Sequence, residues 1–364
     1  MHRWTTRCLR LSAAGLGALA SAAVLAASPT YRIAPVAKGN GVVPTSASAI
    51  SDNGNVAGSG RVSGEKWDVT FIARSGQKLQ PLEGSEGAPG YNLDVNNAGD
   101  VLGYYLRDEG DSRSLQGAMW HGDGTMVSLV ELAGCTRGAD MDYSIPVALN
   151  GAGDAVFKAH CLLNGAPVDG PVVRYQGVVS VLPDLGGGQT YAQDINGNGQ
   201  VTGFSMLPPD SHGISEAEAF IWQNGVMTPL GTLGGKSSYA DAINELGHVA
   251  GTSVLASGSA RTFLYDGASM RELPRCGGKN AVTPVGITND DRVVGVYGGR
   301  KNRHTALIEG GKCQLLDALL NASGVDWTNL HATGVNNQGV IVGDGLYLGK
   351  ERAFIATPIA ADDR

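Results

Sequence analysis

The chain has 364 residues, with 27 basic and 34 acidic side chains, a formal net charge of −7 and only 6% aromatic residues. This acidic balance argues against nucleic acid or an anionic membrane as the partner. The densest basic stretch, residues 299–304 (GRKNRH), is predicted to be a solvated loop tip. Beyond the N-terminal segment, no run approaches the roughly 18 apolar residues that a spanning helix needs, so we expect no membrane insertion of the mature chain.

The N-terminus is typical of a secretory signal peptide. Arg3, Arg7 and Arg10 precede a short apolar stretch rich in Ala and Leu, which ends in small residues. We therefore expect residues 1–28 to be a signal peptide, with an uncleaved anchor as the alternative. Its removal leaves 24 basic against 34 acidic residues. Secretion could end in the periplasm or outside the cell, and the sequence leaves both open.

A ten-residue phrase that recurs seven times is the most informative signal in the chain. Its copies begin at Ala49 (AISDNGNVAG), Asp94 (DVNNAGDVLG), Ala148 (ALNGAGDAVF), Asp194 (DINGNGQVTG), Ala242 (AINELGHVAG), Gly286 (GITNDDRVVG) and Gly334 (GVNNQGVIVG). They are spaced roughly 44 to 54 residues apart, a period typical of propeller or solenoid arrays. No linker interrupts the repeats, so residues 29–364 are predicted to form a single all-β domain.

Each repeat carries four short strand signals, most completely in the fifth copy at 239–244, 248–253, 262–265 and 270–273. In the recurring N-x-x-G, the Asn side chain is expected to open a tight turn by bonding to the backbone ahead. The Gly is expected to close that turn in a left-handed conformation. The sixth copy has Asp290-Asp291 at this point, and Asp tolerates the same conformation. The third copy ends in Phe157 where the others have Gly, so its second strand should differ locally.

Four strands in each of seven units predict a seven-bladed β-propeller. The last repeat lacks a fourth strand before the chain ends, whereas residues 30–37 form a strand signal without a partner of its own. We therefore predict that residues 31–36 supply the outer strand of the seventh blade and close the ring. An open superhelical array is the alternative, but it would leave exposed edge strands at both ends.

The fourth copy also resembles the start of a calcium loop, with oxygen-bearing side chains at Asp194, Asn196 and Asn198. The twelfth position of such a loop needs a bidentate acid, and it is occupied by Ser205. Turn formation accounts for all seven copies and calcium for one at most. We therefore expect no metal and no other cofactor.

A second phrase marks the predicted third strands, as in EAFIWQNG from Glu218, RTFLYDGA from Arg261 and RAFIATPI from Arg352. Together with AxxINxxGxVxG, it resembles the bacterial extracellular repeat family named for its His-Ala-Phe phrase. The resemblance covers nearly the whole mature chain, although only His304 keeps the histidine. It implies secretion and a β-propeller, and it implies no agreed activity or catalytic residue.

Four cysteines remain after signal removal, an even number that suggests disulfides in a secreted chain. Cys135 and Cys161 are placed on the same face of neighbouring blades, so a bond between them is expected. Cys276 ends one outer strand and Cys313 begins the next, and those ends should point to opposite faces. Their pairing is left open.

Candidate binding residues stand four positions before the second, aliphatic residue of the ten-residue phrase, and this position is expected near the mouth of the central channel. Three are tyrosines and one is a histidine, namely Tyr91, Tyr191, Tyr239 and His331. Exposed aromatic rings there would suit stacking on a sugar ring. Packing of the tyrosines between blades is the competing interpretation, and it is favoured.

An enzymatic interpretation centres on the loop at 208–219, which groups Asp210, His212, Glu216 and Glu218. Such side chains could perform acid–base chemistry on a glycan, but acidic secreted loops commonly have this composition.

The preferred function is therefore a secreted module that binds a carbohydrate or another extracellular partner. A glycan-active hydrolase or lyase is the alternative, and a structural envelope or matrix component is a third. A cluster of three or more acids converging within the channel would favour the enzyme, and an aromatic-lined, acid-poor mouth would favour binding.

Overall fold

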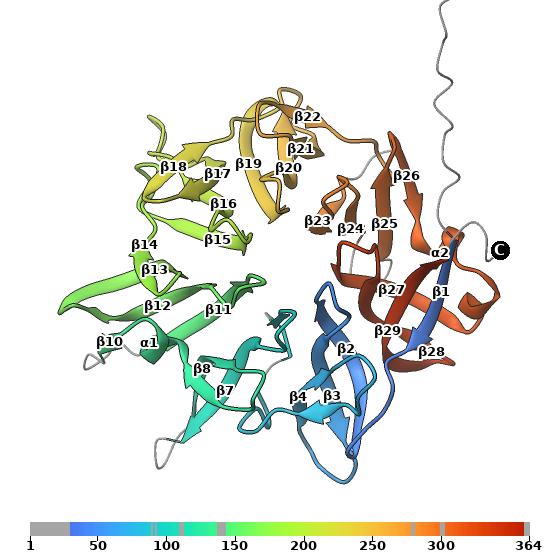
Figure 1. Ribbon diagram of the computed structural model, residues 1–364. Helices are drawn as coiled ribbons and strands as arrows, with labels where there is room; N and C mark the ends of the chain where they lie inside the picture. Colours follow the sequence, from blue (N-terminus) through green and yellow to red (C-terminus); the bar gives the residue numbers. More distant parts are fainter. Residues whose placement is uncertain are drawn as a thin grey trace, which may run out of the picture.

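The computed structural model describes residues 30–88, 90–91, 93–108, 113–136, 143–277, 281–298 and 303–359. The predicted signal peptide lies outside the described residues. The described chain forms seven antiparallel sheets arranged as blades around a central channel, which confirms the predicted seven-bladed β-propeller (Figure 1). Blade three carries one extra short strand, β10 (Cys135–Thr136), beside β12.

The strands of each blade follow one another from the channel outward, except in blade seven. Blade one contains β2 (Val42–Ile50), β3 (Val56–Val62), β4 (Asp68–Ala73) and β5 (Gln80–Pro81). Blade two contains β6 (Asp94–Val95), β7 (Val101–Asp108), β8 (Arg113–Trp120) and β9 (Met126–Ser128). Blade three contains β11 (Tyr143–Leu149), β12 (Ala155–Leu163), β13 (Ala166–Tyr175) and β14 (Val178–Val181). Blade four contains β15 (Thr190–Ile195), β16 (Val201–Met206), β17 (Ala217–Gln223) and β18 (Val226–Pro229).

The remaining blades repeat this order. Blade five contains β19 (Gly234–Ile243), β20 (Val249–Leu255), β21 (Ala260–Tyr265) and β22 (Met270–Glu272). Blade six contains β23 (Thr283–Ile287), β24 (Val293–Tyr297), β25 (His304–Glu309) and β26 (Lys312–Leu315). Blade seven contains β27 (Trp327–Val335), β28 (Ile341–Tyr347), β29 (Lys350–Ile359) and β1 (Thr30–Pro35). Three short helical turns, α1 (Leu129–Leu132), α2 (Leu316–Leu319) and η1 (Ala322–Gly324), lie in the connections.

The N-terminal strand closes the ring as predicted. Strand β1 pairs antiparallel with β29 along its whole length, from Thr30 opposite Ile359 to Pro35 opposite Phe354. Tyr31 and Ile33 point into the core with 0% and 3% of their surface exposed. The first and last strands of the propeller therefore share one sheet, in which β1 covers the edge that β29 would otherwise leave unpaired.

The turn chemistry of the repeat is as expected. In the fifth copy, the Asn244 Oδ1 accepts hydrogen bonds from the backbone N–H groups of Leu246 and His248. Gly247 closes the turn at a φ of 80°, and Asp291 adopts a φ of 62° at the equivalent point of the sixth copy. The Asp–Asp variant therefore keeps the same hairpin.

The same asparagine also joins neighbouring blades, a role that the sequence analysis did not predict. The Asn244 Nδ2 donates to the Thr288 carbonyl of the next blade at 3.0 Å. Equivalent bonds run from Asn150 to the Asn196 carbonyl, from Asn196 to the Asn244 carbonyl and from Asn336 to the Ser51 carbonyl. Because these side chains are buried and bonded on both sides, each amide stabilises its own turn and the contact between two blades.

A close approach of the innermost strand explains the last Gly of the repeat. A Cβ placed on Gly251 would lie 2.1 Å from the Tyr239 carbonyl oxygen and 2.7 Å from the ring of Phe263, which is fully buried on the third strand. In blade three the large and small side chains change places: Phe157 occupies the glycine position, and it pairs with Val172, which stands where blade five has Phe263. The predicted local difference is therefore a substitution of one core aromatic for another.

Both cysteine pairs are disulfide-bonded. The Cα atoms of Cys135 and Cys161 are 5.9 Å apart, and those of Cys276 and Cys313 are 5.2 Å apart. The first bond is the predicted one. The second forms because β22 ends at Glu272 and the connection after it packs between blades five and six, where Cys276 is buried. The expectation that these two cysteines point to opposite faces was therefore wrong.

Candidate ligand-binding face

The predicted aromatic residues lie on the innermost strands or just before one, and the tyrosines are accessible. Tyr91, Tyr191 and Tyr239 expose 59%, 44% and 36% of their surface, whereas His331 is partly buried. Tyr191 lies near the start of β15, and Tyr239 and His331 lie within β19 and β27. All three have the same register, because each pairs with the residue that follows the last Gly of its phrase, so they lie at the same level of the channel.

Two of the tyrosines belong to one continuous aromatic row. The Phe204 ring stacks on Tyr191 of its own blade, with ring centroids 4.8 Å apart. It also meets Tyr239 of the next blade edge to face, with centroids 5.0 Å apart. Tyr239 therefore packs against the neighbouring blade and remains partly exposed at the same time, so for this residue the two interpretations of the sequence are not exclusive.

Phe204 was not among the residues predicted from the sequence. It directly follows the last Gly of the fourth copy, in register with Tyr191 across the sheet. Tyr104 stands at the same point of the second copy and contacts Tyr91 edge to face, with centroids 5.7 Å apart. An aromatic residue immediately after the glycine was thus the available signal.

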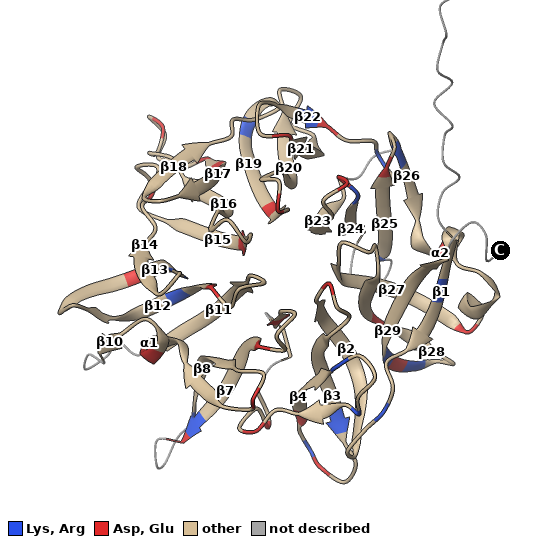
Figure 2. Ribbon diagram, viewed as in Figure 1, with Lys and Arg blue, Asp and Glu red and all other residues tan. Residues whose placement is uncertain are grey.

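Inside the channel, a cavity of about 310 Å³ is lined by three carboxylates, Asp94, Asp194 and Asp241. In Figure 2, acidic segments lie at the channel-facing ends of β15 and β19. The Asp94 Oδ2 accepts the N–H of Leu149 in the next blade at 2.8 Å, and the Asp194 Oδ2 accepts the N–H of Ile243 at 2.9 Å. Two of the three acids therefore join blades through backbone amides.

Burial raises the pKa of all three carboxyls. The pKa of Asp94 rises to about 6 and that of Asp194 to about 7, although their amide partners counteract the effect. Desolvation alone raises the pKa of Asp241 to about 7, and its Oδ2 has no hydrogen-bond partner among the described residues. Asp241 is consequently the one of these three carboxyls that has an oxygen without a hydrogen-bond partner among the described residues.

The structure does not bring the acidic loop residues together as a catalytic pair. The Asp210 Oδ1 accepts the N–H groups of His212 and Ile214, which lowers the pKa of this carboxyl. Glu216 lies 2.8 Å from the Lys236 Nζ, and Glu218 accepts the N–H of Gly231 at 2.9 Å. The Asp210 carboxylate thus stabilises a turn, Glu216 forms an ion pair, and Glu218 binds a loop amide.

In the fourth copy, a calcium ion would compete with hydrogen bonds for the side-chain oxygens. Both Asp194 oxygens accept amide hydrogens, and the Asn196 Oδ1 accepts the N–H groups of Asn198 and Gln200. The Asn198 Nδ2 donates to the Glu245 carbonyl. Within the described ranges, no group of three or more His, Cys, Asp or Glu side chains could hold a metal ion.

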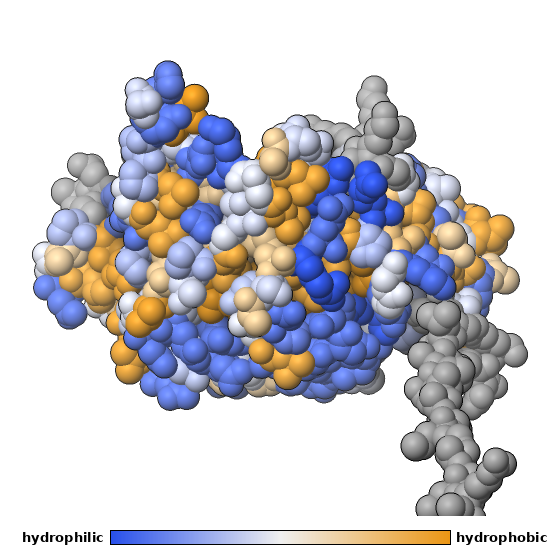
Figure 3. All heavy atoms as spheres, turned by 90° about the horizontal axis from the view of Figure 1, so that it is seen from above, coloured by the Kyte–Doolittle hydropathy of each residue, from blue (hydrophilic) through white to orange (hydrophobic). Residues whose placement is uncertain are grey.

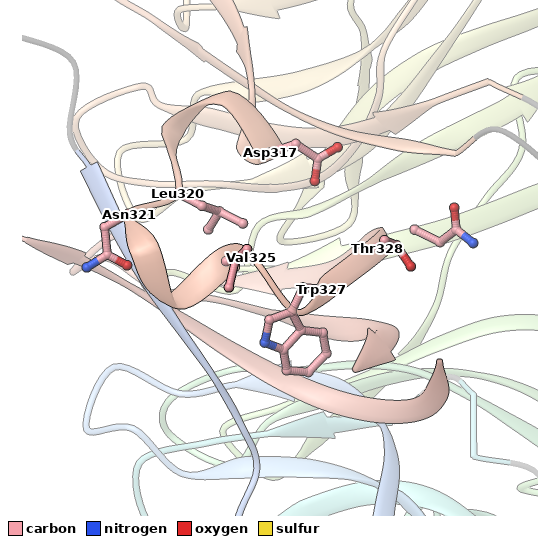
Figure 4. A pocket seen from close by; sticks show the side chains of 8 residues that line it. Asp317, Leu320, Asn321, Val325, Trp327 and Thr328 are labelled. Carbon is pink, nitrogen blue, oxygen red and sulfur yellow. The ribbon is translucent and has the colours of Figure 1, made fainter. Parts of the chain in front are cut away.

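A separate pocket of about 410 Å³ lies in blade seven, between the α2–η1 connection and β27 (Figure 4). Leu320, Val325 and Trp327 line one side of it, and Asp317 lies at the other. Burial raises the pKa of Asp317. The Trp327 indole packs against Tyr347, with centroids 5.0 Å apart, so this wall belongs to the core of the blade.

Comparison with known proteins supports the fold alone. No family model matches the chain, and no curated protein matches it. The puromycin-hydrolyzing peptidase of Mycobacterium tuberculosis matches 89% of this chain with a TM-score of 0.52 at 12% identity. The acylaminoacyl peptidase of Pyrococcus horikoshii matches 84% of it with a TM-score of 0.50 at 11% identity. This chain spans about half of those proteins, 55% and 49% of their lengths, and likeness at such identity assigns no activity.

Proposed function

We propose that this propeller is a secreted binding module that holds a saccharide at the aromatic end of its channel. The row formed by Tyr191, Phe204 and Tyr239 is the observation that carries the proposal, because it combines exposed ring faces with a rigid support. Aromatic faces suit the apolar faces of sugar rings, and the Tyr191 and Tyr239 hydroxyls can orient sugar hydroxyls. The hydrophobic surface visible in Figure 3 is divided into small patches by hydrophilic residues.

Secretion forms part of the same proposal. Two disulfides suit an oxidising compartment, and the N-terminal sequence is typical of an exported protein. Among the described residues, no helix is long and apolar enough to cross a membrane. Membership of the His-Ala-Phe repeat family is proposed on the repeat phrases alone.

A glycan array, paired with a reducing-sugar release assay, tests this proposal. We expect the protein to retain one class of glycan on the array and to release no reducing ends from it. Absence of binding to every glycan on the array would contradict the saccharide proposal and would favour a protein partner or a structural role.

Glycan cleavage is the second candidate, because three acids line the channel cavity, as expected for an enzyme, and one of them, Asp241, combines an oxygen without a hydrogen-bond partner with a pKa near neutrality. Glycoside hydrolysis normally needs two carboxyls, and the oxygens of Asp94 and Asp194 already accept backbone hydrogen bonds. Binding is therefore the better supported function. Release of reducing ends that is lost in Asp241→Asn would reverse this order.

A further inference from the structure

A second pocket on the binding face has a different chemical character. It measures about 780 Å³ and extends from blade five to blade seven. Its described lining contains three basic side chains, Arg261, Arg303 and His331, together with Ser259, Thr283 and Tyr297, and no acidic side chain. This basic pocket is unusual in a chain that has more acidic than basic residues.

The basic pocket adjoins the aromatic row through blade five. Tyr239 pairs with Thr252 on β20, and the adjacent Ser253 pairs with Arg261 on β21. Tyr239 and Arg261 therefore flank the same end of β20. One extended ligand can reach both without crossing the channel.

Within the basic pocket, Arg303 is the arginine without a carboxylate partner among the described residues. Its Nη1 lies 3.5 Å from the His331 Nε2, and this imidazole places its Nδ1 3.3 Å from the Asp344 Oδ1. Asp344 thus orients the imidazole, and the imidazole holds one guanidinium nitrogen. No carboxylate among the described residues contacts Arg303. Residues 299–302 of the predicted loop tip lie outside the described residues, and Arg303, which is exposed, lines the basic pocket.

Arg261 is fixed in place at the edge of the pocket, and its charge is already paired with a carboxylate that lies outside the lining. Only 13% of its side chain is exposed, its Nε lies 3.0 Å from the Glu272 Oε1, and its Nη1 donates to the Ala260 carbonyl. The pocket between blades three and four offers a contrast. There Lys158 lies 3.0 Å from the Asp169 Oδ1, so its charge is already balanced within the lining.

We propose that the basic pocket receives the carboxylate of a hexuronate residue, so that the saccharide bound on this face is an acidic polysaccharide. This inference rests on the proposed saccharide-binding function and names its ligand class. Arg303 contributes a guanidinium, whose planar donors match a carboxylate, while Tyr297, Ser259 and Thr283 supply a ring and hydroxyls for the sugar. Tyr239 stacks on a neighbouring residue of the same chain.

The test uses oligogalacturonate, oligomannuronate, oligoguluronate and a glucuronate-bearing xylan oligosaccharide, each also as its methyl ester. The mature protein is titrated with each probe by calorimetry. We expect at least one acid form to bind, with a loss of tenfold or more on esterification, because the ester removes the charge and keeps the rings. Arg303→Ala should cause a similar loss for the acid form, and Arg303→Lys should restore part of it. Arg271→Ala, which changes an exposed arginine on β22 outside the lining, should leave affinity unchanged.

Equal binding of the acid and its ester would overturn the carboxylate inference and leave the saccharide proposal intact. The same holds if Arg303→Ala binds the acid as the wild type does while Tyr191→Ala and Tyr239→Ala reduce binding. Failure of every acid probe, in a protein that binds a neutral glycan on the array, would also overturn it. Failure of all glycans, acidic or neutral, would contradict both proposals.

Discussion

Closure of the ring by the N-terminal strand is expected to supply much of the stability of this propeller. Strand β1 buries Tyr31 and Ile33 against blade seven, whereas Arg32 on the same strand is exposed. Truncation of a buried Ile to Ala typically costs about 2–5 kcal/mol, and truncation of a large buried aromatic about 3–5 kcal/mol. Domains have a total stability of only about 5–15 kcal/mol. Deletion of residues 29–38 should therefore remove most of the free energy of unfolding.

Urea unfolding followed by circular dichroism measures this loss. We expect Ile33→Ala to lower the free energy of unfolding by about 2–5 kcal/mol and Arg32→Ala to change it by less than about 0.5 kcal/mol. A synthetic peptide of residues 29–38, added to the deletion variant, should restore part of the stability in proportion to its concentration. A deletion variant that unfolds at the wild-type urea concentration would refute ring closure by β1.

Three further predictions concern the interior. Burial raises the pKa of Asp241 to about 7, and those of Asp94 and Asp194 to about 6 and 7, so the wild type should lose stability as the pH rises from about 4 to 7. Asp241→Asn should remove the share of this loss that Asp241 causes, a gain of at most about 4 kcal/mol relative to wild type between pH 3 and pH 8, and identical pH profiles of urea unfolding would contradict it. Asn244→Ala removes an acceptor for two turn amides and a bond to blade six. We therefore expect urea unfolding to show a free energy of unfolding that is lower by about 2–3 kcal/mol, against less than about 1 kcal/mol for Asn289→Ala, which changes an exposed asparagine. Non-reducing peptide mapping should recover Cys135 linked to Cys161, and a free thiol at either position would exclude that bond.

The architecture was predictable because its signals are local and repeated. Seven copies of one turn phrase specify the blades, and the unmatched strand at the N-terminus predicts the closure that β1 and β29 show. The prediction for the sixth copy, which lacks the turn glycine, is also confirmed, since Asp291 adopts the left-handed conformation that glycine adopts elsewhere. Each of these inferences needs only a short stretch of sequence and its period.

The site was less predictable because it depends on contacts between blades. Phe204 joins Tyr191 to Tyr239 only when two repeats are packed side by side. Asp194, which resembled a calcium ligand in its own repeat, accepts an amide hydrogen from Ile243 in the next one. The Cys276–Cys313 bond likewise depends on the path of a connection, which strand order does not specify.

The central claim is that exposed rings at the channel mouth bind a saccharide, and the double variant Tyr191→Ala/Tyr239→Ala tests it most directly. Binding to the glycan array and scanning calorimetry are measured together on this variant, with Tyr191→Phe/Tyr239→Phe as the control that keeps both rings. If each ring contributes about 1 kcal/mol of stacking, the Ala variant should lose roughly 30-fold in affinity while its melting transition stays cooperative. The Phe control should retain most of the binding. Wild-type glycan binding by the Ala variant, or a collapsed melting transition showing that the rings serve only as interblade packing, would contradict the account.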